Sequence, residues 1–368
     1  MIHKSCQHGG GVVHAFQVSA VSPHTEFFPQ TTQPPVLTKT TNDNGNNGGS
    51  SLPLKPVSTD PLLLVSTQPV LSPFECHTLS DYFQKQQLGG QGAEVLHSLQ
   101  DRLDTLICRP PQDCHDRVQP RFLSYQPCNK KQKQKPTDAL ALQKWLLPDG
   151  LHVDTNNGKF FRYLTVLVYL TSSSSAATNF PLGLRRKNNS GTRDEGKLLE
   201  ASMTLLQANV KHTRADYNDC RDDESSQGNK DPRTLLEQAA WETYINDSNA
   251  GNAQQDIGIR VLPRQGHITV FASIDPASGM ADPRSWHGPE VLLPGDSKEL
   301  LSFFYEVPVE EFVDQTTLGQ AVGRRLNLLH DKYVKHVPAG VDAESKPNPL
   351  DDNDTIVSMP DMQLLVVQ

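Results

Sequence analysis

The chain has 368 residues, of which 36% are hydrophobic and 21% charged, and this is enough for one large buried core with extensions. Its formal net charge of −8 makes nucleic acid an unfavourable partner, because binding phosphates requires a basic surface. The sequence contains no apolar run approaching the roughly 18 to 20 residues of a membrane-spanning helix, so no membrane partner is expected. Residues 12–21 lack the features of a secretory signal, and the default location is therefore cytoplasmic.

The N-terminal stretch, residues 1–58, contains Asn-Asn and Gly-Gly pairs and few side chains that could be buried. Burial in such a segment would not compensate for the entropy lost on ordering it, so we predict a disordered or loosely ordered extension. The folded part is expected to begin with a short apolar strand at residues 61–65.

Two helices are predicted between residues 72 and 108. Ser72, Pro73 and Glu75 have the spacing of a helix start, with a capping hydroxyl, a proline at the first position and a carboxylate that can bond back to the cap. The second helix carries an apolar stripe from Val95 to Leu106. The first helix has a stripe of Cys76, Leu79 and Phe83, and both stripes are typical of helices that pack on a core.

The segment His152-Val153-Asp154 is the first candidate for chemistry. Residues i and i+2 of a strand point to the same side, so His152 and Asp154 can face one metal ion while Val153 points away. A second histidine follows far downstream, in Ser285-Trp286-His287-Gly288. Two imidazoles and one carboxylate can occupy one face of an octahedral metal ion and leave the opposite face open.

Several stretches around these motifs are predicted strands. Residues 162–170 are apolar on both faces, as expected of a strand inside a sandwich, and by period two Tyr163, Thr165, Leu167 and Tyr169 should share one face. Residues 258–271 read as strand, turn and strand, and residues 298–305 as another strand.

The region between residues 182 and 257 is a long insertion, with helices expected at 198–206 and 234–245. A segment of this length is either a lid near the active-site mouth or disordered. Further on, an amphipathic helix is expected at about residues 316–334, and residues 362–367 could add an edge strand.

The order of these motifs resembles the catalytic domain of the 2-oxoglutarate- and Fe(II)-dependent dioxygenases, in particular the prolyl 4-hydroxylase-like branch. That family carries H-x-D, then R-x-x-T-x-x-x-Y-L, G-G-E-T-x-F-P and P-x-x-G-x-x-x-x-F, and ends with a second His and a basic residue. The resemblance covers roughly residues 60–308. It implies an all-β core with flanking helices, a double-stranded β-helix (jelly roll, cupin-like).

The resemblance also implies a domain organisation. A dioxygenase domain would span residues 59–310, with the insertion at about 182–257, and residues 311–368 would form a C-terminal helix and tail.

By the same resemblance, His152, Asp154 and His287 are the iron ligands, and Lys298 pairs with the distal carboxylate of 2-oxoglutarate. Tyr169 and Tyr125 match tyrosines that contact this cosubstrate. The implied cofactors are Fe(II), 2-oxoglutarate, O2 and, as a reductant, L-ascorbate (vitamin C). The implied oxidoreductase activity is hydroxylation of a substrate, of which a protein prolyl residue is one candidate, with release of succinate and CO2.

The chain departs from the family pattern at three places. Ser175-Ala176-Ala177-Thr178 stands where the family has G-G-E-T, and the gap from Tyr125 to His152 is longer than usual. Lys298 follows His287 by eleven positions, one more than usual, which a β-bulge could absorb.

Two alternatives therefore stay open. One is a catalytically silent jelly-roll module that binds a partner, and the other is an oxygenase of the same core that acts on a small molecule. Iron-dependent conversion of 2-oxoglutarate would separate the first alternative from an enzyme.

Overall fold

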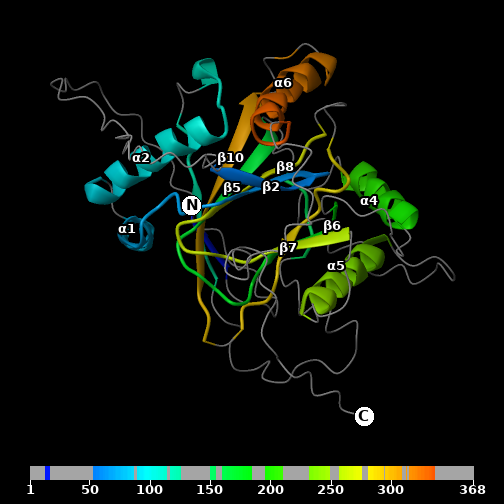
Figure 1. Ribbon diagram of the computed structural model, residues 1–368, viewed down its shortest axis with the longest axis horizontal. Coiled ribbons are helices and arrows are strands. Elements are labelled where there is room, and N and C mark those ends of the chain that lie inside the picture. The colour runs from blue at the N-terminus through cyan, green and yellow to red at the C-terminus, as the bar shows by residue number, and fades with distance from the viewer. Residues whose placement is uncertain are drawn as a thin grey trace, which may run out of the picture.

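Two antiparallel β-sheets form the centre of the molecule, and helices cover both outer sides (Figure 1). The computed structural model describes residues 13–16, 53–86, 89–113, 117–125, 150–154, 160–184, 195–209, 232–248, 257–275, 281–293, 295–308, 312 and 315–335. Within these ranges, the arrangement confirms the expected antiparallel β core with flanking helices.

The larger sheet has seven strands in the order β1-β4-β10-β5-β8-β3-β2, and neighbouring strands all run antiparallel. Its central strands are apolar on both faces because both faces are covered, as predicted for residues 162–170. The strands are β1 (Val13–Phe16), β2 (Leu54–Thr59), β3 (Leu62–Ser66), β4 (Arg121–Tyr125), β5 (Phe160–Tyr169), β8 (Ile268–Ala272) and β10 (Lys298–Pro308).

The smaller sheet has the strand order β7-β6-β9, with β6 at Thr178–Leu184, β7 at Ile257–Val261 and β9 at Gly288–Pro289. Its inner face packs on the inner face of the larger sheet through a cluster that includes Leu63, Phe180 and Phe271. Burying each of these large side chains stabilises the sandwich by about 1.5–3 kcal/mol. We call the space between the two sheets the sandwich interior.

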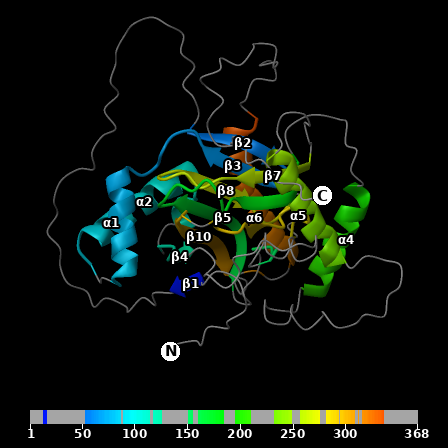
Figure 2. The same cartoon turned by 90° about the horizontal axis from the view of Figure 1, so that it is seen from below.

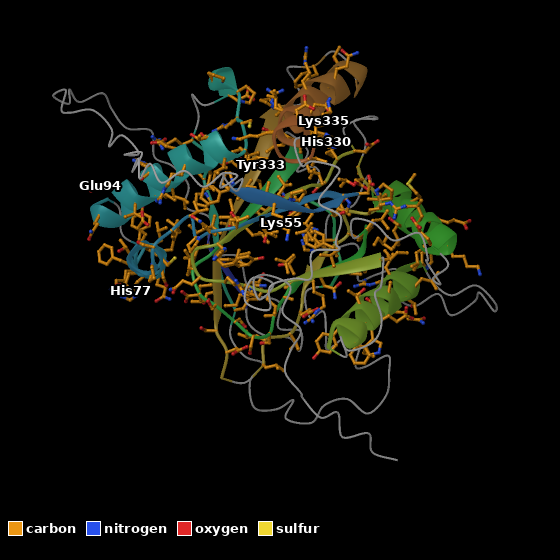
Figure 3. The ribbon with its side chains drawn as sticks, viewed as in Figure 1. Lys55, His77, Glu94, His330, Tyr333 and Lys335 are labelled. Carbon is orange, nitrogen blue, oxygen red and sulfur yellow. The ribbon has the colours of Figure 1, made fainter. Side chains whose placement is uncertain are left out.

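Helices α1 (Pro73–Gln84), α2 (Gln91–Leu106) and α6 (Gln315–Tyr333) pack on the outer face of the larger sheet, and a short 3-10 turn, η1 (Pro111–Asp113), follows α2. Ser72 and Glu75 form the predicted capping box at the start of α1. Tyr333, near the end of α6 (Figure 3), donates its hydroxyl hydrogen to the Leu106 carbonyl at 2.8 Å and so ties α6 to α2.

Helices α4 (Glu195–Asn209) and α5 (Pro232–Ser248) lie on the opposite side of the molecule, beside the smaller sheet (Figure 2). They confirm the helices predicted at 198–206 and 234–245. Leu198, Leu236 and Ala240 pack there with Leu182 of β6. None of the described helices combines the length and apolar character needed to cross a bilayer.

The structure corrects the predicted face of one side chain in β5. The register of β5 against β10 shifts by one residue at Tyr163, because Leu164 pairs with Tyr305 while Arg162 pairs with Glu306. This bulge reverses the alternation of side chains, so the prediction that Tyr163 shares a face with Thr165 and Tyr169 was wrong: Tyr163 packs in the cluster on the outer face.

Strand β1 and all of β2 except Thr59 come from the stretch 1–58, and both strands pair within the larger sheet. Most of the stretch 1–58 lies outside the described residues, as do the possible strand at 362–367 and most of the gap between Tyr125 and His152. The three-part domain division therefore stays a prediction.

Candidate metal centre

The two histidines of the predicted site lie directly opposite each other on paired backbones. The N–H of His152 donates to the His287 carbonyl at 2.9 Å, and the N–H of His287 donates to the His152 carbonyl at 2.9 Å. Such a doubly bonded antiparallel pair places both side chains on the same side. The two imidazole centroids are 4.5 Å apart.

Gly288 allows this close pairing. A Cβ atom built at Gly288 would lie 2.6 Å from the carbonyl oxygen of Gly150, which is closer than any real Cβ contact. A larger residue would push the segment carrying His287 away from the segment carrying His152. The glycine in Ser-Trp-His-Gly is thus a signal for close backbone approach that the sequence contained.

Asp154 completes the cluster. Its Oδ1 lies 3.6 Å from Nε2 of His152, and its Oδ2 lies 3.6 Å from Nε2 of His287. The hydroxyl of Thr165, on β5, donates to Oδ2 at 3.0 Å and fixes the carboxylate. One ligand atom from each of the three residues lies within 4.8 Å of the others.

The tautomer of His287 is set by its surroundings. Nδ1 lies 2.9 Å from the carbonyl oxygen of Ser285, so Nδ1 carries the proton and donates it there. This leaves a lone pair on Nε2, the atom that faces Asp154. The ring itself is held between Phe180, at a centroid distance of 5.3 Å, and Phe271, at 4.6 Å. A backbone carbonyl holding the second nitrogen is typical of a metal-binding histidine.

Asp154 is charged in this environment. Burial by itself raises the pKa of its carboxyl group, but when the imidazoles are protonated the hydrogen bond and charge of His287, the charge of His152 and the Thr165 hydroxyl outweigh burial. A bound metal ion would supply this positive charge in place of the protons on the two Nε2 atoms. The net result is a pKa well below the usual range for an aspartate. The donor set is therefore two imidazole nitrogens and one carboxylate oxygen.

This donor set fits a divalent metal ion. His152 is 40% exposed at its side chain while Asp154 and His287 are buried, so the cluster has one open side. Imidazole and carboxylate ligands with open positions are the pattern of non-haem Fe(II) oxygenases. Within the described part of the chain, no other group of three His, Cys, Asp or Glu residues has this geometry.

Lys298 lies deep in the sandwich interior, at the start of β10, and is 1% exposed. Its Nζ donates to the Ala176 carbonyl at 2.6 Å and lies 5.0 Å from the ring centroid of Tyr125. Lys298 and Tyr125 are also directly opposite in the pairing of β10 with β4. The structure therefore brings together two of the three residues that the resemblance assigns to the cosubstrate.

Tyr169, the third of these residues, is 1% exposed and points into the same interior. Its hydroxyl oxygen accepts a hydrogen bond from Thr269 at 3.3 Å and lies 3.4 Å from the Thr178 hydroxyl. Burial raises the pKa of its phenol, so the hydroxyl stays protonated and available as a donor.

A staple that the sequence analysis missed connects the loops on either side of Lys298. Asp296 Oδ2 accepts hydrogen bonds from the Oγ atoms of Ser173 at 2.9 Å, Ser174 at 3.0 Å and Ser175 at 2.6 Å, and from the Ser175 N–H at 3.0 Å. We call this the Asp296 staple. A run of serines opposite an aspartate was its only sequence signal.

The next residue, Ala176, has φ +57° where the family pattern has glycine. Its carbonyl accepts the hydrogen bond from Lys298. Asp296 lies two residues before Lys298 and bonds to Ser175, the residue before Ala176. The Asp296 staple therefore holds both partners of the hydrogen bond between Lys298 and Ala176 in place.

Trp286, beside the second histidine, does not line an open mouth. It is 3% exposed and packs with Leu151 of the first histidine strand and with Leu198 and Leu236 of α4 and α5. It serves to fix the strand that carries His287.

The antiparallel β-sandwich thus brings a His-x-Asp segment and a distant His together through a backbone bridge. Among solved structures, the chain is similar to a viral collagen prolyl hydroxylase from Paramecium bursaria chlorella virus-1 in its 2OG complex. That match has 12% identity, a TM-score of 0.34, and covers 67% of this chain and 96% of that one.

The chain is also similar to HygX from Streptomyces hygroscopicus, solved with nickel, 2-oxoglutarate and hygromycin B. Here the identity is 12% and the TM-score 0.30, over 68% of this chain and 84% of that one. No family model matches the chain, and no curated protein matches it in sequence. A likeness at this level leaves the function to be argued from the site itself.

Proposed function

We propose that this protein is an Fe(II)- and 2-oxoglutarate-dependent dioxygenase that hydroxylates a substrate with release of succinate and CO2. The observation that carries this proposal is the convergence of His152, Asp154 and His287 on one point, with the charges and tautomer that a metal requires. When bound, an Fe(II) centre supplies the oxidising chemistry that couples consumption of 2-oxoglutarate and O2 to hydroxylation.

In this proposal, the chain's own residues bind and orient. His152, Asp154 and His287 would hold the metal, with Thr165 fixing the carboxylate and Ser285 fixing one imidazole. Lys298 would release the Ala176 carbonyl and form a charge-assisted pair with the distal carboxylate of the cosubstrate. Tyr125 and Tyr169 would line this end of the site.

The closed geometry of the sandwich supports these assignments. Lys298 and Tyr169 are each 1% exposed, so the cosubstrate end of the site is shielded from water. A charge pair formed there would be stronger than one on the surface. The domain limits at residues 59–310, and ascorbate as reductant, belong to the same proposal.

Two kinds of substrate are candidates for this dioxygenase: a protein prolyl residue and a small molecule. The name of one similar structure refers to collagen prolyl hydroxylation, and that of the other to hygromycin B. A silent binding module is disfavoured by the complete donor set, because a site with no metal to hold would not need a buried charged Asp154 between two imidazoles.

Turnover of 2-oxoglutarate tests the proposal. The purified chain is incubated with Fe(II), ascorbate and labelled 2-oxoglutarate, and succinate is measured. We expect His152→Ala and His287→Ala to abolish succinate formation while circular dichroism shows a retained fold. His77→Ala is the matched control, since His77 is exposed on α1 (Figure 3), a helix that packs on the outer face of the larger sheet. Full turnover in either ligand variant, or no turnover in the unaltered protein, would contradict the proposal.

A further inference from the structure

Two arginines and a phenylalanine form a platform beside the candidate metal centre. Cζ of Arg121, on β4, lies 5.0 Å from the ring centroid of Phe304, on β10, and Cζ of Arg162, on β5, lies 4.2 Å from the same centroid. Phe304 is directly opposite Thr165 in the pairing of β10 with β5. Thr165 donates a hydrogen bond to Asp154, so only the Thr165 side chain lies between Phe304 of the platform and this candidate metal ligand.

The two guanidinium groups differ in their partners. Nε of Arg162 donates to Oε1 of Glu306 at 2.6 Å, so its charge is neutralised. For Arg121, the described residues provide neither an ion pair nor a hydrogen bond to the guanidinium. The platform of Arg121, Phe304, Arg162 and Glu306 therefore carries one uncompensated positive charge.

Keeping this charge half-buried has a cost. Burial first, and then the nearby charge of Arg162, lower the pKa of Arg121, while the charges of Asp154 and Glu306 act in the opposite direction. A guanidinium that is partly removed from water without a carboxylate partner destabilises the fold by itself. Such a group is expected where a ligand completes it.

The position of Arg121 separates it from the cosubstrate end of the site. Arg121 and Tyr125 are the two ends of β4 on its inner face, and Tyr125 lies beside Lys298. Four residues of strand span about 13 Å at about 3.3 Å per residue. One cosubstrate held by Lys298 and the metal would leave Arg121 to a second molecule.

We propose that Arg121 binds an anionic group, a carboxylate or a phosphate, of the molecule that is hydroxylated, so that the site selects an acidic substrate. This inference rests on the proposed function. The planar fork of a guanidinium matches both anions with two parallel hydrogen bonds. Phe304 contributes a cation–π contact, with Cζ of Arg121 5.0 Å from its ring centroid, and this contact does not use the N–H donors that an anion would need.

The test uses the full chain loaded with Zn(II), which binds without redox chemistry, and with 2-oxoglutarate to fill the Lys298 end. Acetate and inorganic phosphate are titrated separately in chloride-free buffer, and the Nε–Hε signal of Arg121 is followed by NMR. We expect a saturable shift with one of the two anions. Saturation by acetate indicates a carboxylate substrate, and saturation by phosphate a phosphorylated one.

Three variants complete the experiment, with binding to each followed by calorimetry. Arg121→Gln should weaken anion binding at least about tenfold. Arg121→Lys keeps the charge and the fold and should bind with intermediate strength, because it lacks the fork. Arg117→Gln removes an exposed arginine that pairs with Asp101 on the surface and should change nothing.

The absence of a saturable shift at Arg121, or equal binding by Arg121→Gln and the unaltered chain, would overturn the inference. Failure of the proposed function is detected separately. It would appear as absent binding of 2-oxoglutarate by the Zn(II)-loaded chain, while the anion titration can be repeated without metal or 2-oxoglutarate.

Discussion

Lys298 places an ammonium group in the sandwich interior, away from water. In the structure it is 1% exposed, bonds to the Ala176 carbonyl and lies over the Tyr125 ring. A hydrogen bond from this ammonium group to a carboxylate would be charge-assisted on both sides and stronger than its bond to the neutral Ala176 carbonyl. The residue is therefore poised for an anionic ligand.

Replacing Lys298 by Met keeps most of the side-chain volume and removes the charge. We expect the variant to fold and to bind metal as before, while KM for 2-oxoglutarate rises roughly 30- to 1000-fold, equivalent to about 2–4 kcal/mol. Initial rates of succinate formation at varied 2-oxoglutarate measure this. Lys55→Met, an exposed lysine on β2 (Figure 3), is the control, and an unchanged KM in Lys298→Met would remove Lys298 from the cosubstrate site.

Asp282 lies in the turn before His287 and makes stability depend on pH. Burial, together with the charges of Asp60 and Asp275, raises the pKa of its carboxyl group to about 6, although the Arg284 N–H and side chain act in the opposite direction. Because the folded-state pKa exceeds the ordinary value of 3.8 for an aspartate, the folded state binds the proton more tightly than the unfolded chain does. Its contribution to stability is therefore full at low pH and is lost as pH rises to about 6.

Asp282→Asn removes the ionisable group and keeps an oxygen that can accept the Arg284 N–H, at present 2.8 Å from Oδ1. We expect the free energy of unfolding to rise by about 1–2 kcal/mol at pH 7.5, with a much smaller effect at pH 4. Urea unfolding at the two pH values measures the difference. An equal effect at both would show that the carboxyl group of Asp282 titrates normally.

At the scale of elements, the loops around the site are as well defined as its strands. The Asp296 staple joins the loop after β5 to the loop before β10, and Lys298 follows Asp296 by two residues. Hydrogen bonds from three hydroxyls and one N–H outweigh the effect of burial and lower the pKa of the Asp296 carboxyl group, so it stays charged at neutral pH. Asp296 is thus a positioning residue for Lys298.

Removing this carboxylate should separate positioning from metal binding. In Asp296→Ala we expect KM for 2-oxoglutarate to rise roughly three- to tenfold, because Lys298 and Ala176 are no longer held in register. Affinity for Zn(II) should stay the same. Ser174→Ala, which removes a single exposed hydrogen bond of the staple, is the matched control. A loss of thermal stability with KM unchanged would mean that the staple is purely structural.

The sequence predicted those elements whose evidence is local. The capping box at Ser72 and Glu75, the continuous apolar run of β5 and the stripes of α2 and α6 each depend on neighbouring residues. The phase of Tyr163 could not be predicted, because the bulge depends on how β5 pairs with β10 more than 100 positions away. A one-residue shift changes the face of every side chain beyond it.

In the candidate metal centre, too, local features could be predicted from the sequence and contacts between distant residues could not. The strand period predicted that His152 and Asp154 face the same way, but only the resemblance indicated that His287 joins them. The Ser285 carbonyl sets the tautomer of His287, and the Thr165 hydroxyl orients the carboxylate of Asp154. Their roles depend on geometry that residue types alone do not encode.

At the scale of the whole molecule, the smaller sheet is covered by α4 and α5. Beneath α5, Arg260 of β7 forms two hydrogen bonds with Glu290, at 2.6 Å each, and Asn179 of β6 donates to Glu290 at 3.0 Å. Asn179 also donates to the Ala240 carbonyl of α5 at 3.2 Å, and Arg260 lies under the ring of Tyr244 on α5. The described part of the insertion is thus docked on the sheet, and a lid role for the remainder stays a prediction.

Glu290→Gln tests how strongly α5 depends on this network. Arg260 and Glu290 are each 2% exposed at the side chain, so removing the charge of Glu290 takes a buried ionic partner away from Arg260. We expect the free energy of unfolding to fall by about 3–5 kcal/mol. Amide hydrogen exchange in α5 should speed up more than in α2, because the Asn179 link to Ala240 loses its anchor. Asp81→Asn, which breaks the exposed pair with Lys85, should leave stability and exchange unchanged. If the double variant Arg260→Met/Glu290→Leu restores stability but not the slow exchange of α5, the ion pair serves mainly to fix the helix on the sheet that carries β9 and the second histidine.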